Sequence, residues 1–296
     1  MTKSYIFIIK NCGSVFACRE SKITHILNLH NDKFIEVFNR IRLPYESNKI
    51  YNINDELFIS DNENNLFKYN HNGCFSLFEI PQSIISIEMI SLIDFGNYIF
   101  IDDDHVIWYC SNKLVFNKMC LPPALYYNTC FQWTLLLDTD NNLWSVQTEY
   151  GYKETKIICY LPKIYKICCG YSHIILLDFE KKLWVMGNNK FGQLGIGNTK
   201  NILIFTIIED NLPPFIDISC GMFHSCATDY EGKIWICGSN IYGQKGITTK
   251  FLPIIGLPPI VSVTCSKYNT LTLDSEYFLW SCRHRNYSNN SNNSNN

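Results

Sequence analysis

Short apolar, β-prone runs recur along the chain, and they come in pairs separated by a few polar residues. "IILLD" and "LWVMG", within residues 174–187, form one such pair. Two runs of this length on either side of a polar reversal predict a β-hairpin. After an intervening loop, two further extended runs follow within residues 202–221, "ILIFTIIE" and "FIDISCG". The pattern therefore predicts repeated units of four short strands.

An aspartate lies six residues before an aromatic residue in six of these units, and Lys10 takes its place before Phe16 in a seventh. The aspartates are Asp61, Asp102, Asp138, Asp178, Asp229 and Asp274. The aromatic anchors are Phe16, Phe67, Trp108, Trp144, Trp184, Trp235 and Trp280, at spacings of 51, 41, 36, 40, 51 and 45 residues. We expect each aspartate to end the first strand of a hairpin and to accept hydrogen bonds from the amides of the turn.

A glycine-rich stretch, "GNNKFGQLGIGN" at residues 187–198, has a copy at residues 238–246, "GSNIYGQKG". Alone, the stretch is typical of a loop that holds phosphate, because its glycines lie beside Lys190. A phosphate loop, however, continues as Gly-Lys-Ser or Gly-Lys-Thr into a helix. Gly195 is followed here by "IGN", with no helical period. We therefore interpret the glycines as meeting the backbone geometry of a compact loop after the second strand.

Four-stranded units that recur about seven times with this period predict an all-β fold, a seven-bladed β-propeller with one repeat per blade. We expect the tryptophans to pack between neighbouring blades. The chain begins and ends at a hairpin, so seven hairpins are joined by six connecting strand pairs. Either one thin blade is stitched from both ends of the chain, or the ring is incompletely closed.

Two segments carry the details of a known repeat. "CCGYSH" with "WVMGNNKFGQLGIG" (within residues 168–197) and "SCGMFH" with "YEGKIWICGSNIYGQKG" (within residues 219–246) resemble the regulator of chromosome condensation repeat. The resemblance is specific over residues 165–250 and holds in outline over residues 120–164 and 251–285. Over residues 1–119 it rests on the hairpin register alone. It implies a seven-bladed propeller, and because several spacings are shorter than usual for the family, we expect some blades to be trimmed.

We place a single propeller at residues 1–285, with its clearest repeats at about residues 141–178, 181–229 and 232–274. Residues 286–296, rich in Asn and Ser, have the composition of a disordered tail.

Charge and composition exclude several classes of protein. The net charge of −2 gives no overall basic field for nucleic acid or acidic membranes. No apolar run approaches the roughly 18 to 20 residues of a spanning helix, and the run Tyr5 to Ile9 is too short for a signal peptide. Fourteen cysteines without an export signal indicate reduced thiols. We expect a monomeric protein of the cytoplasm or nucleus, not secreted, without a membrane, small-molecule or direct nucleic-acid partner.

Cysteine and histidine could ligate a metal, but they recur in the repeat register. Cys169 and Cys220 lie fifteen residues before their tryptophans, and His173 and His224 lie eleven before. Equivalent positions are spread around a ring, whereas zinc needs its ligands around one point. We interpret these residues as buried core, and "DDDH" at residues 102–105 as a solvated hairpin tip. No catalytic, cofactor-binding or metal-ligating residue is assigned, and no cofactor is expected.

The recognisable residues are structural, so we expect a non-enzymatic scaffold that binds a protein partner through loops on one face of the ring. The resemblance implies an alternative, guanine nucleotide exchange on a Ran-like small GTPase, with association to chromatin. The segment "HNDKFIEVFNRIRLPYE", residues 30–46, is a candidate for a loop that projects toward a GTPase. A third alternative is an inhibitor or adaptor that plugs another enzyme through the ring face.

Overall fold

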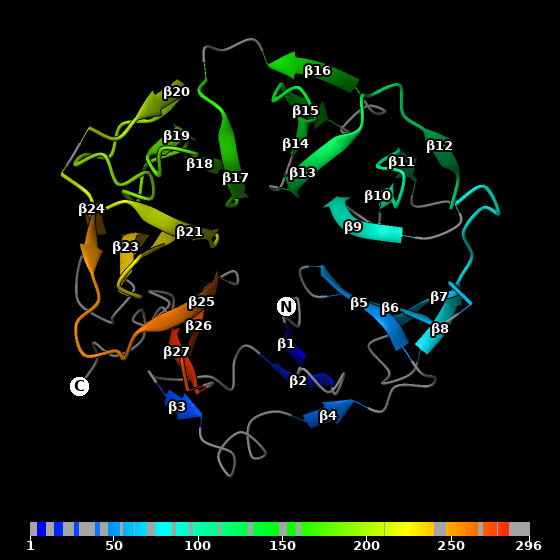
Figure 1. The fold of residues 1–296 in the computed structure, drawn as a ribbon, viewed down its shortest axis with the longest axis horizontal. Coiled ribbons are helices and arrows are strands. Elements are labelled where there is room, and N and C mark those ends of the chain that lie inside the picture. The colour runs from blue at the N-terminus through cyan, green and yellow to red at the C-terminus, as the bar shows by residue number, and fades with distance from the viewer. Residues whose placement is uncertain are drawn as a thin grey trace, which may run out of the picture.

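The described residues of the computed structural model form seven separate antiparallel sheets, arranged around a common centre (Figure 1). These residues are 5–9, 15–19, 27–29, 39–41, 47–53, 56–61, 63–69, 75–84, 87–94, 97–111, 114–129, 133–147, 153–157, 161–209, 211–239, 247–265, 269–276 and 278–283. Six sheets have four strands and one has three. Each sheet is one blade of an all-β propeller, as the repeat pattern predicts.

Five consecutive blades are each built from four strands that follow one another in the chain. The second blade comprises β5 (Ser47–Ile53), β6 (Glu56–Asp61), β7 (Leu66–Tyr69) and β8 (Phe75–Phe78). The third comprises β9 (Ile87–Asp94), β10 (Asn97–Asp102), β11 (Ile107–Cys110) and β12 (Phe116–Lys118). The fourth comprises β13 (Ala124–Thr129), β14 (Trp133–Asp138), β15 (Leu143–Gln147) and β16 (Lys153–Ile157). The fifth comprises β17 (Ile164–Cys169), β18 (His173–Asp178), β19 (Leu183–Gly187) and β20 (Ile202–Ile207). The sixth comprises β21 (Phe215–Cys220), β22 (His224–Asp229), β23 (Ile234–Ser239) and β24 (Ile247–Pro253).

The first and last blades share the N-terminal part of the chain. The first contains β1 (Tyr5–Ile9), β2 (Val15–Arg19) and β4 (Asn39–Ile41). The last contains β25 (Ile260–Cys265), β26 (Asn269–Asp274) and β27 (Leu279–Arg283), and its fourth strand is β3 (Leu27–Leu29). β3 lies antiparallel to β27, with Asn28 opposite Trp280. The thin blade and the stitched blade are therefore two different sheets, and the outer strand of the last one comes from the start of the chain.

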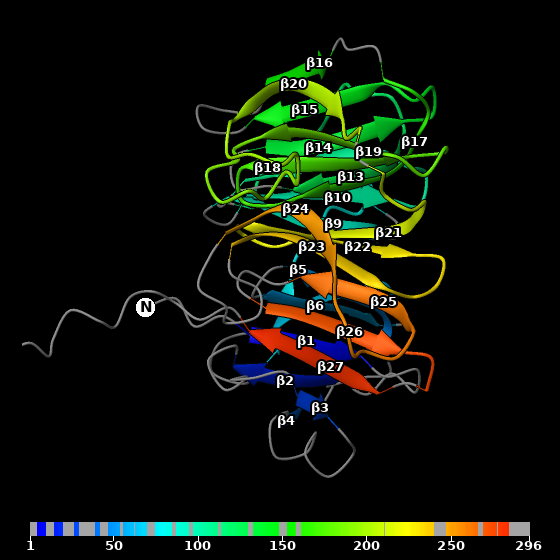
Figure 2. The same cartoon turned by 90° about the vertical axis from the view of Figure 1, so that its left-hand side faces the viewer.

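The strands of one repeat divide between two blades. The run at β20 pairs with β19 and completes the fifth blade, whereas the next run, β21, opens the sixth blade. The inner strands β5, β9, β13, β17, β21 and β25 contact one another in sequence around the centre (Figure 1). Seen from the side, the blades lie face to face (Figure 2).

The repeated register of the aspartates is explained by the turns that they close. In the sixth blade, Asp229 Oδ1 accepts hydrogen bonds from the amides of Glu231 (2.9 Å) and Lys233 (2.9 Å). The residue three positions after the aspartate has positive φ in five hairpins; these residues are Asn64, His105, Asn141, Lys181 and Gly232. The predicted role of the aspartate as acceptor for the turn amides is confirmed.

The second carboxylate oxygen makes a contact that the sequence pattern did not suggest. Asp229 Oδ2 accepts the indole N–H of Trp235 at 2.8 Å. The same bond, between 2.8 and 2.9 Å, joins the equivalent pairs Asp102–Trp108, Asp138–Trp144, Asp178–Trp184 and Asp274–Trp280. The aspartate ends the first strand of the hairpin, and the tryptophan lies on the second strand. The six-residue spacing thus brings the indole next to the carboxylate.

The core lies between blades. One cluster contains Leu177 and Leu183 of the fifth blade together with Phe215 and Phe251 of the sixth. Trp235 packs against this cluster, and its ring lies edge-on to Phe215 at 6.2 Å. Packing of a repeat tryptophan between neighbouring blades is therefore confirmed here.

Candidate functional site

The glycine-rich loop between β19 and β20 uses its polar groups internally. Asn189 is fully buried, its Oδ1 accepts the amide of Leu194 (2.9 Å), and its Nδ2 donates to the carbonyl of Asn198 (2.8 Å). The amides of Gly192 and Gly195 donate to carbonyl groups within the loop. Because these amides already have protein acceptors, the geometry supports the structural interpretation over a phosphate site. Residues 240–246 of the second copy lie outside the described residues.

The same loop joins the fifth blade to the sixth. The amide of Gly197 donates to the carbonyl of Thr249 on β24 at 2.7 Å. Gly195 has a φ of 70°, and a Cβ placed on it would lie 2.4 Å from the ring of Phe251. The glycine is needed both for its backbone conformation and for the close approach of a neighbouring side chain.

The acidic stretch at residues 102–105 closes a hairpin, as expected. Asp102 Oδ1 accepts the amides of Asp104 (3.1 Å) and Val106 (2.8 Å), and its Oδ2 accepts the Trp108 indole. Asp103 pairs with Lys49 at 3.0 Å in an exposed position. This carboxylate group therefore organises a turn.

The two repeat histidines link the fifth blade to the sixth and the sixth blade to the last. His173 is fully buried, and its Nε2 lies 2.8 Å from Ser225 Oγ on β22. Ser225 Oγ donates to the carbonyl of Gln193, so the imidazole is the donor in this contact. Burial and the nearby charge of His224 lower the pKa of His173 to about 3. The ring is therefore neutral at physiological pH.

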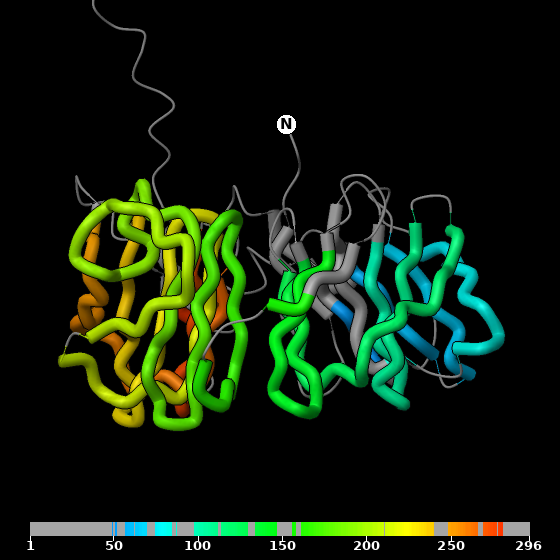
Figure 3. Tube along the Cα trace, turned by 90° about the horizontal axis from the view of Figure 1, so that it is seen from above, coloured from blue at the N-terminus to red at the C-terminus, as the bar shows by residue number. Residues whose placement is uncertain are grey.

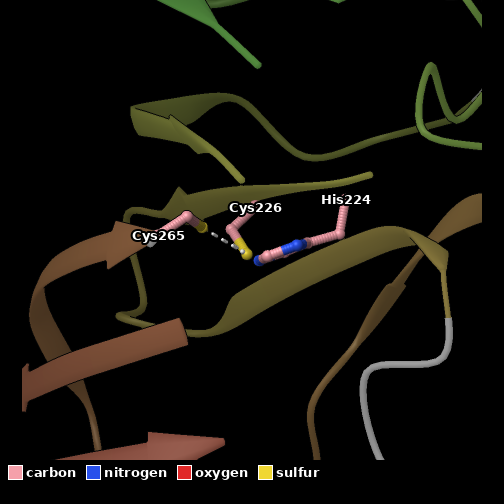
Figure 4. A group of neighbouring side chains, drawn as sticks. All are labelled: His224, Cys226 and Cys265. Carbon is pink, nitrogen blue, oxygen red and sulfur yellow. Dashed lines mark hydrogen bonds between the residues drawn. The ribbon is translucent and has the colours of Figure 1, made fainter. Parts of the chain in front are cut away.

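A second histidine meets two thiols (Figure 4). His224 and Cys226 lie on β22, and Cys265 ends β25 of the next blade. The imidazole nitrogen and the two Sγ atoms all lie within 4.8 Å of one another. The expectation that the ring keeps repeat cysteines and histidines apart does not hold here, because His224 reaches across the blade interface and Cys226 lies outside the repeat register. This trio is the group of described residues that could hold a metal.

Three aromatic side chains gather on the rim of the ring that carries the glycine-rich loop. The ring centroid of Phe191, in that loop, lies 4.8 Å from that of Phe223, and the centroid of Tyr171 lies 6.1 Å from that of Phe223. Tyr171 and Phe191 are 36% and 37% exposed. In Figure 3 this rim is the upper one, where the yellow-green loop emerges. We call Tyr171, Phe191 and Phe223 the aromatic rim patch.

A small cavity lies between the fourth and fifth blades. Its volume is about 200 Å³, and Leu137, Asn141, Lys156 and Leu161 are among its lining residues. Ligand sites for small molecules usually enclose roughly 300–1,000 Å³. This cavity is below that range, and the aromatic rim patch is the stronger candidate for an interaction site.

Models of the "Regulator of chromosome condensation (RCC1) repeat" match residues 181–228 and residues 164–193 and 215–244. The chain is 30% identical over 131 residues to "Protein RCC2 homolog" of Danio rerio, a match covering 40% of this chain and 26% of that protein. It is 36% identical over 109 residues to "Secretion-regulating guanine nucleotide exchange factor" of Bos taurus, covering 34% of this chain and 24% of that protein. These matches therefore span only about a quarter of each relative's length.

The solved structure of Prp20p from Saccharomyces cerevisiae superposes with a TM-score of 0.71 at 11% identity, covering 97% of this chain and 82% of that one. At this identity the likeness concerns the fold. The described residues contain no helix with the length and apolar character that crossing a bilayer requires. Sheet order, the Asp–Trp register and the matched repeats agree with one another. The chain is a β-propeller, and its residues 164–244 match the regulator of chromosome condensation repeat.

Proposed function

We propose that the protein is a non-enzymatic scaffold that binds a protein partner through the aromatic rim patch. The observation that carries the proposal is the partly exposed cluster of Tyr171, Phe191 and Phe223 across two blades. Aromatic residues are enriched at protein interfaces and dominate their energetic centres. We propose a monomer that acts in the cytoplasm or nucleus.

The loops that carry the patch are held in place before any partner binds. Phe191 follows Asn188 and Asn189, whose side chains bind loop amides, and its own amide donates to Gln193 Oε1 at 2.9 Å. Phe223 immediately precedes His224, which is anchored to Thr270 of the next blade. A surface fixed in this way loses little conformational entropy on binding, which favours affinity.

The test is recovery of partners from the native host with wild-type protein and with a Phe191→Ala/Phe223→Ala variant. Truncation of central aromatic residues costs more than about 1–2 kcal/mol, so we expect affinity to fall roughly 5- to 30-fold or more. Leu203→Ser is the matched control, because Leu203 is 87% exposed on β20, outside the patch. Unchanged recovery by the double variant, with an unchanged thermal melt, refutes the role of the patch.

The second candidate function is guanine nucleotide exchange on a Ran-like GTPase. Its support is that one matched relative is named as a guanine nucleotide exchange factor, and that the Prp20p structure was described together with binding to Gsp1p and histones. Residues 30–46, the candidate projecting segment, lie outside the described residues apart from β4. Release of a fluorescent guanine nucleotide from a panel of GTPases tests it. No acceleration at high protein concentration argues against exchange and leaves the scaffold proposal standing.

A further inference from the structure

Four donor atoms lie close together around His224. Thr270 Oγ1 is 3.0 Å from His224 Nε2, 3.6 Å from Cys226 Sγ and 3.8 Å from Cys265 Sγ. The two Sγ atoms are 3.3 Å apart. Zn–S bonds of about 2.3 Å and Zn–N or Zn–O bonds of about 2.0–2.2 Å imply corner separations of roughly 3.3–3.8 Å in a tetrahedral site. These four separations, from 3.0 to 3.8 Å, lie in or just below this range, and the imidazole nitrogen lies within 4.8 Å of both Sγ atoms.

We propose that His224, Cys226, Cys265 and Thr270 form a zinc(II) site that joins the sixth blade to the last. His224 and Cys226 come from β22, whereas Cys265 and Thr270 come from β25 and β26. Sites with two cysteines and one histidine hold zinc with a fourth, oxygen ligand. Here the Thr270 hydroxyl occupies the position that water takes in such sites.

Charge and ligand type select zinc among the common metals. Thiolate and imidazole ligands favour zinc or copper(I) over magnesium, calcium or manganese. Two thiolates neutralise the double charge of zinc(II), whereas with copper(I) the cluster keeps one negative charge. Cys226 and Thr270 are only 1% exposed, and Ile236, Ile260 and Val263 surround the site. A neutral cluster suits this apolar environment, because burying an uncompensated charge is costly.

The preceding pair of blades supplies a natural comparison. In the repeat register, His224, Cys265 and Thr270 correspond to His173, Cys220 and Ser225. The remaining proposed ligand, Cys226, corresponds in the same register to Ile175. His173 binds Ser225 across its interface as His224 binds Thr270. The preceding interface thus has no thiol at the position of Cys226, although Cys168 contacts its Cys220.

The experiment uses the full chain, purified without a histidine tag and kept reduced. Zinc(II) content is measured after dialysis, and cobalt(II) is titrated as a spectroscopic probe. We expect about one equivalent of zinc and a cobalt spectrum with tetrahedral visible bands and a thiolate charge-transfer band. Cys226→Ile copies the neighbouring interface and is expected to lose this equivalent. If the larger isoleucine side chain prevents folding, Cys226→Ser replaces this variant and is likewise expected to lose the equivalent of zinc.

A gain of binding gives the converse test. Ile175→Cys places a thiol beside His173, Cys220 and Ser225, and we expect it to raise the zinc content to about two equivalents. A chelator is expected to lower the melting temperature of the wild type but not of Cys226→Ser. Wild-type protein that binds neither ion, or Cys226→Ser protein that retains the full equivalent, overturns the proposal. An Ile175→Cys protein that stays at one equivalent overturns the assignment of the ligands by register.

Discussion

The bond between the Trp235 indole and Asp229 can be removed while an aromatic ring stays in place. Trp235→Phe deletes the N–H that donates to Asp229 Oδ2 at 2.8 Å, and Asp229 is only 4% exposed. The second blade carries the altered arrangement naturally. There Phe67 follows Asp61, and Asn65 Nδ2 donates to the free carboxylate oxygen at 3.0 Å. The second blade therefore combines the phenylalanine with a substitute donor, and Asn142 makes the same bond to Asp138 Oδ2 (2.9 Å) beside Trp144.

The expected loss follows from the charge on the acceptor. A hydrogen bond to a charged group contributes about 1.5–3 kcal/mol, and the smaller ring buries less surface. We expect Trp235→Phe to cost about 2–3 kcal/mol, which corresponds to a fall in melting temperature of roughly 5–10 °C. Trp235→Ala, which also removes the ring, is expected to cost about 3–5 kcal/mol.

Lys233→Asn supplies the remedy, because residue 233 follows Asp229 by four positions as Asn65 follows Asp61. In the Trp235→Phe background it is expected to restore about 1 kcal/mol. In the wild type it should change stability by less than about 0.5 kcal/mol, since the Lys233–Glu231 pair is exposed. Urea unfolding followed by circular dichroism measures all four proteins. Equal stability of Trp235→Phe and wild type, or an equal effect of Lys233→Asn in both backgrounds, refutes the reasoning.

Three further substitutions test the blade interfaces. His173 becomes protonated near pH 3 in the folded protein but already below pH 6.5 in the unfolded chain. The free energy of unfolding should therefore decrease as the pH is lowered from 6.5 toward 3, by about 2 kcal/mol at pH 5. His173→Asn, which copies Asn269 in the last blade, should flatten that pH dependence in urea titrations; an unchanged slope contradicts it. Gly195→Ala should cost more than about 2 kcal/mol because its Cβ meets the Phe251 ring, whereas Gly197→Ala, whose Cβ meets a flexible lysine, should cost less; the reverse order of melting temperatures contradicts this.

The hairpins could be predicted because everything that forms them is local. The aspartate, the turn residue of positive φ and the tryptophan lie within seven consecutive positions, so their spacing records their contacts. The blade that an outer strand joins, in contrast, is not determined by local sequence. β3 pairs with β27 across some 250 residues of sequence, and its three residues carry no pattern that distinguishes the first blade from the last. Which blade receives such a strand is decided by how the ring packs.

The difference between local contacts and contacts between blades also explains why the proposed metal site could not be predicted from the sequence. Register shows which positions are equivalent, and equivalent positions are indeed separated around a ring. Contacts between blades, however, join non-equivalent positions: the histidine of one repeat meets the residue after the histidine position of the next, as His224 meets Thr270. Cys226 then adds a ligand at a position where the neighbouring repeat has Ile175. In a propeller, chemistry that is absent from the repeat consensus is therefore best sought where a deviation in one blade faces the register of the next.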